Sequence, residues 1–263
     1  MIVGIVASAV FTGCAPAGSG GPGGRGNVPS GIASNCSADV TDAMNFWLNS
    51  LPQGSTAVLA SNACYDVEGH VVVQDRRDFT LEGNGATLRR FNTPPSWDRY
   101  ARQVQFLNGG NITIRNLKIV GPKPDNIGYQ TGYLESEAGL GVAVDGATVS
   151  NVYVTGAWGD GINLSGGGNN IKIVNSTVNQ AARQGIAVTN ASNVTINDDR
   201  VLAAHRFGID IEPYAGTDRV NGIAITNSYV CGNIGPIAGV SHWGVTGVFL
   251  WNDIYCFGAP VGK

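Results

Sequence analysis

Gly161-Ile162-Asn163-Leu164 and Gly185-Ile186-Ala187-Val188 share one pattern, a glycine followed by two aliphatic residues with a variable residue between them. Three further copies are Gly141-Val142-Ala143-Val144, Gly208-Ile209-Asp210-Ile211 and Gly247-Val248-Phe249-Leu250. A second alternating pattern is interleaved with the first: Asn111-Ile112-Thr113-Ile114, Asn151-Val152-Tyr153-Val154, Asn170-Ile171-Lys172-Ile173, Asn193-Val194-Thr195-Ile196 and Gly222-Ile223-Ala224-Ile225. Short alternating strands that recur about every 20 to 40 residues predict an all-β solenoid, a parallel β-helix.

The composition of the 263-residue chain fits one elongated domain of tightly turned strands. Glycine, with 38 residues, is about twice as common as average. Charged residues make up only 13% of the chain, and the net charge of −3 gives no reason to expect nucleic acid as a partner. No apolar run reaches the roughly 20 residues that a membrane-spanning helix needs.

The N-terminus resembles a bacterial lipoprotein signal, in which a cysteine after a small residue is lipidated. An apolar run from Ile2 to Phe11 precedes Cys14, although no Lys or Arg stands before the run. A flexible Gly/Pro/Ser-rich linker follows. We expect a signal segment over 1–14, a linker over 15–34 and one domain over 35–263. The protein is then secreted or lipid-anchored at the bacterial cell surface, a monomer that meets a membrane only through its lipid.

Four further cysteines remain after Cys14. An even number in an exported chain favours two disulfides. We expect Cys36–Cys64 and Cys231–Cys256, since each pair sits at one end of the solenoid. Four buried free thiols are the alternative.

Residues 37–51 predict an amphipathic helix that covers the first coil. Thr41 is a candidate N-cap, and Met44, Trp47, Leu48 and Leu51 form its apolar stripe.

One column of residues predicts a ladder of stacked amides along the solenoid. Asn116, Asn175, Asp198 and Asn227 each lie four residues beyond the first aliphatic residue of an alternating strand. Side chains at equivalent positions of stacked coils can bond along the axis. We therefore interpret Asp198, in Asn197-Asp198-Asp199-Arg200, as part of a structural turn rather than a catalytic motif.

The alternating strands and the capping helix resemble the pectate-lyase-like superfamily of right-handed β-helices over residues 35–256. The resemblance implies a groove on the sheet of the glycine-led strands and a polysaccharide as partner. Polygalacturonases of this superfamily share Asp160, but Arg183-Gln184 stands where they carry Asp-Asp, and Phe207 where they carry His. Mannuronan epimerases match only at Gly208 and Asp210. No cofactor is predicted; calcium fits the superfamily, but no ligand set is evident.

Stacking of the glycine-led strands brings one polar patch together, because adjacent coils lie about 4.8 Å apart. The predicted catalytic residues are Asp160, Arg183, Arg206, Asp210 and Glu212. The predicted substrate-binding residues are Asn163, Gln184, His205, Tyr214 and Trp251. The loop from Gly121 to Gly139 is a candidate wall for this patch.

The patch is compatible with two kinds of chemistry. Asp210 and Glu212 lie two apart on one strand, with Cα atoms about 6.5 to 7 Å apart, which suits the acid–base pair of an inverting glycosidase. Alternatively, Arg183 or Arg206 binds a uronate carboxylate. Asp210 or His205 then removes the adjacent proton, as in a lyase or epimerase.

The same residues also permit readings without catalysis. The arginines and carboxylates could form a surface ion-pair network, and Asp160 before a glycine could be only a turn residue. The patch could also serve a carbohydrate-binding or adhesion module. A purely structural solenoid is the third alternative.

Overall fold

The computed structural model describes residues 23–94, 102–125, 127–213, 217–218 and 220–234, together with the backbone of 238–240 and 250–252. The elements are β1 (Arg25–Asn27), β2 (Asn35–Asp39), α1 (Thr41–Ser50), β3 (Thr56–Val58), β4 (Cys64–Asp66), β5 (Val71–Gln74), β6 (Thr80–Glu82), β7 (Thr87–Arg89), β8 (Arg102–Val120), η1 (Gly132–Ser136), β9 (Ala138–Thr155), β10 (Ile162–Leu164), β11 (Gly168–Val174), β12 (Thr177–Asn179), β13 (Ile186–Val188), β14 (Ala191–Asn197), β15 (Arg200–Leu202), β16 (Ile209–Ile211), β17 (Val220–Thr226), β18 (Tyr229–Cys231), β19 (Ala238–Val240) and β20 (Leu250–Asn252). No helix among the described residues is long and apolar enough to cross a membrane.

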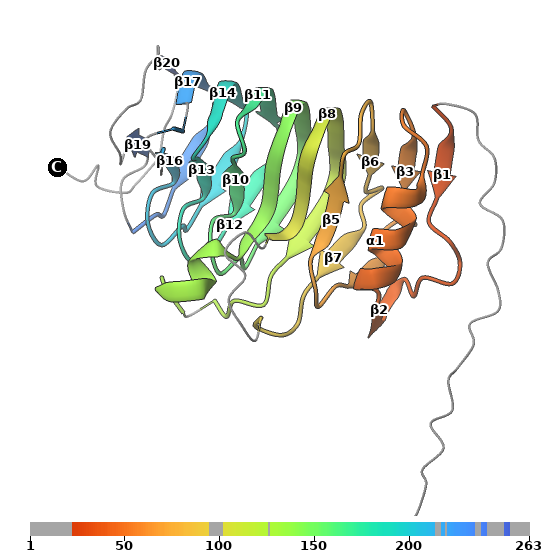
Figure 1. The fold of residues 1–263 in the computed structure, drawn as a ribbon. Helices are drawn as coiled ribbons and strands as arrows, with labels where there is room; N and C mark the ends of the chain where they lie inside the picture. The colour runs from red at the N-terminus through yellow and green to blue at the C-terminus, as the bar shows by residue number, and fades with distance from the viewer. Residues whose placement is uncertain are drawn as a thin grey trace, which may run out of the picture.

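The strands stack coil upon coil into a parallel β-helix, which confirms the predicted fold (Figure 1). The first sheet contains β5, β10, β13, β16, β19 and the first parts of β8 and β9. The second sheet contains β1, β3, β6, β11, β14, β17 and β20 with the middle parts of β8 and β9. The third sheet contains β2, β4, β7, β12, β15 and β18 with the last parts of β8 and β9.

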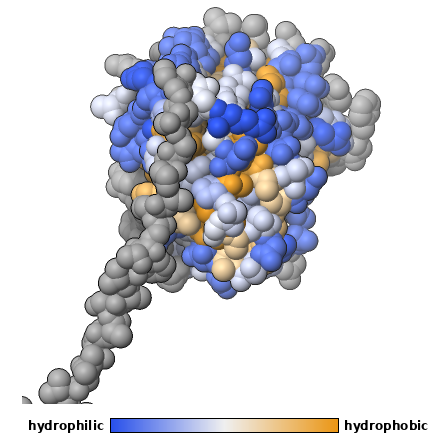
Figure 2. All heavy atoms as spheres, turned by 90° about the vertical axis from the view of Figure 1, so that its right-hand side faces the viewer, coloured by the Kyte–Doolittle hydropathy of each residue, from blue (hydrophilic) through white to orange (hydrophobic). Residues whose placement is uncertain are grey.

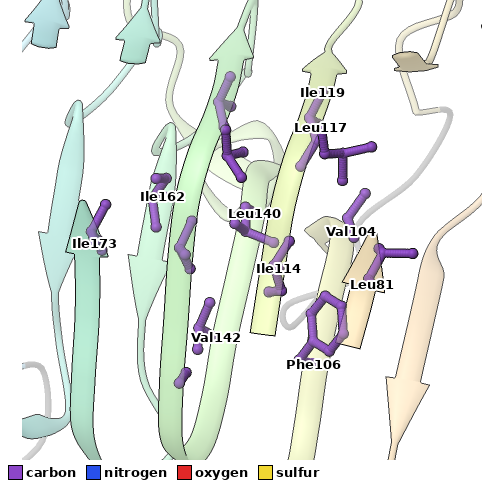
Figure 3. Packing of buried hydrophobic residues seen from close by; sticks show 14 of the residues in the cluster. Leu81, Val104, Phe106, Ile114, Leu117, Ile119, Leu140, Val142, Ile162 and Ile173 are labelled. Atoms are coloured by element: carbon purple, nitrogen blue, oxygen red, sulfur yellow. The ribbon is translucent and has the colours of Figure 1, made fainter. Parts of the chain in front are cut away.

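Aliphatic side chains fill the interior of the solenoid in columns. Leu140, Ile162, Ile186 and Ile209 are paired in register on successive strands of the first sheet, and all four are fully buried. Figure 3 shows such side chains, among them Val104, Leu140 and Ile162, in the packed interior. Alternation along each strand directs every second side chain to this core, so the residues between them face outward.

The register corrects two copies of the glycine-led pattern. Leu140 pairs with Ile162, so Gly139 rather than Gly141 is equivalent to Gly161. The strand that follows β16 in the first sheet is β19, whereas Leu250 belongs to β20 in the second sheet. An alternating pattern matches itself again after a shift of two residues, and spacing alone does not separate these registers.

The asparagine-led pattern needs one similar correction. Ala147 pairs with Ile112 and Ile171, so the equivalent coil position begins at Gly146 rather than at Asn151. Gly146 has a φ of 69°, close to the 52° of Asn111. Glycine and asparagine replace each other here because both tolerate the left-handed region.

The predicted amide column forms one corner of the solenoid. Asn116, Asn175, Asp198 and Asn227 all have left-handed backbone, and Asn151 joins them with a φ of 52°. Asn151 Nδ2 donates to Asn116 Oδ1 of the preceding coil at 2.7 Å. Asn227 instead donates to Asn197 at 2.9 Å, so amide bonding along the axis holds for part of the column.

A buried polar stack lies directly beside this column. Ser176 Oγ accepts a hydrogen bond from Val152 N, and Ser228 Oγ accepts one from Asp199 N. Asp199 Oδ1 accepts from Ser176 N at 2.7 Å, while its Oδ2 is buried without a hydrogen-bond partner. Asp199 therefore occupies a position that serine fills in the neighbouring coils.

Helix α1 covers the N-terminal coils, and Met44, Trp47 and Leu48 are buried as predicted. The N-cap is Val40 rather than Thr41. Thr41 begins the helix, and its N–H and hydroxyl both donate to Asp39 Oδ1. Figure 2 looks onto this end of the solenoid and shows apolar patches among hydrophilic residues.

Side-chain amides of this cap pair with the backbone edge of β5. Asn45 Nδ2 donates to His70 O, and its Oδ1 accepts from Val72 N. Asn49 bonds Val72 O and Gln74 N in the same way. Each amide thus replaces a peptide unit of a neighbouring strand, and the edge is closed to other chains.

We expect the double change Asn45→Leu and Asn49→Leu to destabilise the protein by about 1 to 3 kcal/mol per site, because β5 loses two hydrogen bonds at each site. The freed edge is also expected to promote self-association. Urea unfolding and light scattering measure the two effects. Ala43→Leu, at an exposed position of the same helix, is the control. A stable, monomeric double variant would show that the amides do not close the edge.

The N-terminal boundary and the disulfides complete the fold. β1 lies within the predicted linker and pairs with β3, so part of that segment belongs to the solenoid. Cys36 and Cys64 form a disulfide, which confirms that predicted pair. Cys231 is also disulfide-bonded. Cys14 and Cys256 lie outside the described residues.

Candidate active site

A groove of about 870 Å³ lies on the first sheet. Its floor includes Gly141 of β9, Asn163 of β10, Ser165 directly after β10 and Thr189 directly after β13. The segment around η1, with Tyr133 and Glu135, lines one side. The groove therefore lies where the superfamily resemblance implied, and the Gly121–Gly139 loop supplies a wall.

Arg183 holds two carboxylates of the groove together. Its Nη1 lies 3.0 Å from Asp160 Oδ1, and its Nη2 lies 2.7 Å from both carboxylate oxygens of Glu212. Glu135, from η1, lies 3.8 Å from Nε. Burial lowers the pKa of Arg183, but the charges of Asp160 and Glu212 outweigh it and raise the pKa above its usual range. Arg183 is therefore a permanent cation between acids.

Asn163 connects this cluster to a second arginine. Asn163 Nδ2 donates to Asp160 Oδ2 at 3.1 Å, and its Oδ1 accepts from Arg102 Nη2 at 3.3 Å. Arg102 Nη1 donates to Ser136 O at 2.6 Å, which links β8 to η1. Asp160 also accepts from Gln184 N. Asp160 thus accepts hydrogen bonds from three donors, Asn163, Arg183 and the backbone N–H of Gln184.

Asp210 and Gln184 do not line the groove. Both are fully buried, and Gln184 Nε2 donates to Asp210 Oδ2 at 2.7 Å. Gln184 Oε1 accepts from Phe207 N. Asp210 lies in β16 and Glu212 directly follows this strand, but only Glu212 lines the groove. Direct contact of Asp210 or Gln184 with a ligand is therefore not supported.

Arg206 contacts the wall loop instead of the carboxylates. Its guanidinium lies 5.1 Å from the ring centroid of Tyr129. Burial, and then a hydrogen bond to Glu135, raise the pKa of Tyr129. Arg183 and Arg206 thus hold two residues of the same loop. Arg206 is not among the residues that line the groove, so contact of its guanidinium with a ligand is not supported.

His205 also lies outside the groove lining, beside the same loop. Burial, and then the charge of Lys123, lower the pKa of His205. Lys123 Nζ donates to the carbonyl oxygens of Pro124 and Ile127 at 2.9 Å. The ring of His205 lies beside Gly128 of this loop, and its predicted contact with substrate is not supported.

A buried ion pair anchors the end of the loop. Arg90 Nη1 lies 2.9 Å from Glu137 Oε2, and both side chains are almost wholly buried. Gly159 N donates to Glu137 O, next to Asp160. Glu137 therefore connects the end of the loop to Arg90, directly after β7, and to Gly159, directly before Asp160.

Two predicted binding residues cannot be assigned to the groove. Trp251 stands in β20, which pairs with β17 of the second sheet. This strand does not belong to the sheet that carries the groove, because the fifth glycine-led copy was aligned in the wrong register. Tyr214 lies outside the described residues.

Sequence reasoning missed Arg102. This residue begins a coil whose strand, Val104 to Leu107, pairs with Leu140 to Ala143. The coil carries no glycine at the expected position, so the pattern did not reveal it. Its alternation of Val104 and Phe106 with polar residues was the available signal.

Carboxylates outnumber cations in the groove, whose charged lining residues are Arg102, Glu135, Asp160, Arg183, Glu212 and Asp218. Among the residues that the structure describes, no group of three or more His, Cys, Asp or Glu side chains is arranged to hold a metal ion. Paired carboxylates in a groove can transfer protons to and from a bound sugar.

Comparison with known proteins agrees with this architecture. A family model for the right-handed β-helix region matches residues 98–233. The Dettilon tailspike protein superposes with a TM-score of 0.59 at 14% identity, covering 87% of this chain and 49% of that chain. The endo-xylogalacturonan hydrolase from Aspergillus tubingensis gives 0.58 at 14% identity, with coverages of 88% and 72%.

A double mutant of the periplasmic alginate epimerase AlgG gives a TM-score of 0.53 at 13% identity, with 78% of this chain and 52% of that chain covered. The chain thus spans about half the length of the tailspike and of the epimerase. No curated protein sequence matches it. At these identities the likeness shows the fold alone. The chain belongs to the right-handed β-helix family, and its fold is a parallel β-helix.

Proposed function

We propose that the protein is a polysaccharide-active hydrolase that cleaves a glycosidic bond in the groove of the first sheet. One observation carries the proposal: Asp160 and Glu212, from different coils, line one groove and share one buried arginine. Glycosidases need two carboxyl groups on either side of the scissile bond. The polysaccharide-active β-helix proteins among the structural neighbours support this substrate class.

The hydrogen bonds suggest a division of roles within the pair. Asp160 accepts bonds from Arg183, Asn163 and Gln184 N, which suits a base or nucleophile. Glu212 is then the second carboxyl group of the pair, and it donates a proton to the leaving oxygen only after a bound sugar has displaced its two bonds from Arg183. Arg183 and Asn163 keep the two groups in place, and such positioning accounts for much of the rate in enzymes.

The rival proposal is a non-catalytic glycan-binding module. The observation that favours it is the ion pairing itself, because Arg183 already occupies both carboxylates. In a pure binding module these pairs are structural, and the groove binds sugars without cleaving them. A uronate-directed lyase or epimerase is less well supported, because Arg183 is not open to a substrate carboxylate.

The test is a panel of polysaccharides assayed for new reducing ends and for absorbance of unsaturated uronates. We expect reducing ends without unsaturated products. Asp160→Asn and Glu212→Gln are each expected to lower the rate by about 100-fold or more, with glycan binding retained. Asp218→Asn, another groove carboxylate outside the pair, is the control. Full activity in the Asp160→Asn, Glu212→Gln double variant, or binding with no turnover in the native protein, would refute the hydrolase.

We also propose export, with lipidation at Cys14 as the anchor. The Cys36–Cys64 disulfide supports export, since disulfides persist in oxidising compartments. Fractionation of expressing cells tests this: a soluble cytoplasmic protein with free thiols would refute it.

A further inference from the structure

We infer that the groove takes an uncharged stretch of glycan rather than a uronate-rich one, an inference that rests on the proposed function. The first observation is the charge of the lining. Four carboxylates, Glu135, Asp160, Glu212 and Asp218, face two guanidinium groups, those of Arg102 and Arg183. A groove whose lining carries an excess of negative charge repels negatively charged ligands.

The second observation is that both arginines already serve protein acceptors. Recognition of a carboxylate by arginine uses two parallel N–H donors. Arg183 directs one terminal nitrogen to Asp160 and the other to Glu212. Arg102 directs one to Ser136 O and the other to the side chain of Asn163. A uronate would have to displace these acceptors.

The third observation is that the acceptors are held in place. Asp160 and Glu212 are more than nine-tenths buried, and Asp160 is fixed by two donors besides Arg183. Separating Arg183 from them would leave buried carboxylates uncompensated, which is costly. Asp210, which is buried and does not line the groove, adds a further acid near the site.

Neutral hydrogen-bonding groups make up much of the remaining surface. Gln105, Ser165, Thr189 and Asn190 line the groove together with Tyr133. Amides and hydroxyls both donate and accept, which matches the hydroxyl groups of a neutral sugar. The chemistry of the lining thus favours hydroxyls over carboxylates.

Affinity electrophoresis in gels that contain matched polymers tests the inference. Polygalacturonate and its full methyl ester share a backbone, as do carboxymethyl- and hydroxyethyl-cellulose, and a set of natural neutral polysaccharides completes the panel. We expect the retained polymers to be neutral, with about tenfold or greater preference over an acidic counterpart. The preference should shrink as salt rises, and in Glu135→Gln. Ser165→Trp, which fills the floor, should abolish retention.

Equal or stronger retention of an acidic polymer, or no retention of any polymer, would overturn the inference. The same experiments distinguish failure of this inference from failure of the proposed hydrolase activity. If neutral polymers are retained but never cleaved, the charge preference stands and the hydrolase falls. If an acidic polymer is cleaved and Asp160→Asn abolishes this, the hydrolase stands and the preference falls.

Discussion

Replacing Arg183 by methionine is expected to lower the free energy of unfolding by about 3 to 5 kcal/mol near neutral pH. Methionine keeps much of the volume but removes the cation that Asp160 and Glu212 share at 3.0 and 2.7 Å. The two carboxylates are then buried side by side without compensation. The loss should be larger than for any surface ion pair, because all three side chains are largely withdrawn from water.

The pH dependence distinguishes this cause from simple loss of packing. In the variant, the two buried carboxylates repel one another in the folded state with no cation between them. The free energy of unfolding of the variant should therefore fall as pH rises. Its difference from the native protein should shrink in acid, where both groups are protonated. Urea unfolding at several pH values measures it.

Two variants serve as controls for Arg183→Met. Arg183→Lys keeps the charge and should recover part of the loss. Arg115→Met breaks the half-exposed pair with Glu82 and should cost less than about 1 kcal/mol. If Arg183→Met changes the free energy of unfolding only slightly, or equally at all pH values, then the charge of Arg183 does not stabilise the two carboxylates.

Replacing Asp199 by serine is expected to stabilise the protein at neutral and higher pH. Burial raises the pKa of Asp199 from 3.8 to about 7, opposed by the hydrogen bond from Ser176 N. A pKa raised on folding stabilises the fold only while the group keeps its proton. That contribution is complete below about pH 4 and is lost as pH rises to about 7. At roughly 1.4 kcal/mol per pKa unit, the gain approaches about 4 kcal/mol at most.

Serine fits this position because the neighbouring coils already use it. Ser176 and Ser228 accept backbone N–H groups of adjacent coils, as Asp199 does from Ser176. Unfolding of Asp199→Ser should match the native protein in acid and exceed it above pH 7. Asp198→Asn, exposed on the same turn, should change stability by less than about 1 kcal/mol. Equal stability of Asp199→Ser and native protein at high pH would mean that Asp199 carries no burial penalty.

The sequence alone predicted which residues meet across the coils, because stacking is periodic. Asp160, Asn163, Arg183 and Glu212 stand at fixed offsets from their glycines, and the structure brings them into one cluster. The same periodicity failed where it was ambiguous. The pattern aligned Gly141 with Gly161, whereas Gly139 is the equivalent residue, and it assigned Leu250 to the wrong sheet.

Other assignments depended on contacts that no repeat encodes. Arg206 stacks on Tyr129 because the wall loop folds back over its coil. Asp210 accepts a hydrogen bond from Gln184 and does not line the groove, whereas Glu212, two residues later, does. Both acids are buried, and neighbouring segments decide which of them reaches the groove.

The sequence by itself determined a parallel β-helix with a capped N-terminus, a disulfide at that end and a polar patch on the glycine-led strands. These follow from local alternation, glycine and asparagine turns and the stacking of equal coils. Only the tertiary structure decided which carboxylates line the groove and which arginines are occupied. Those outcomes depend on an aperiodic loop and on pairing between coils, where burial and charge are set by residues far apart in the chain.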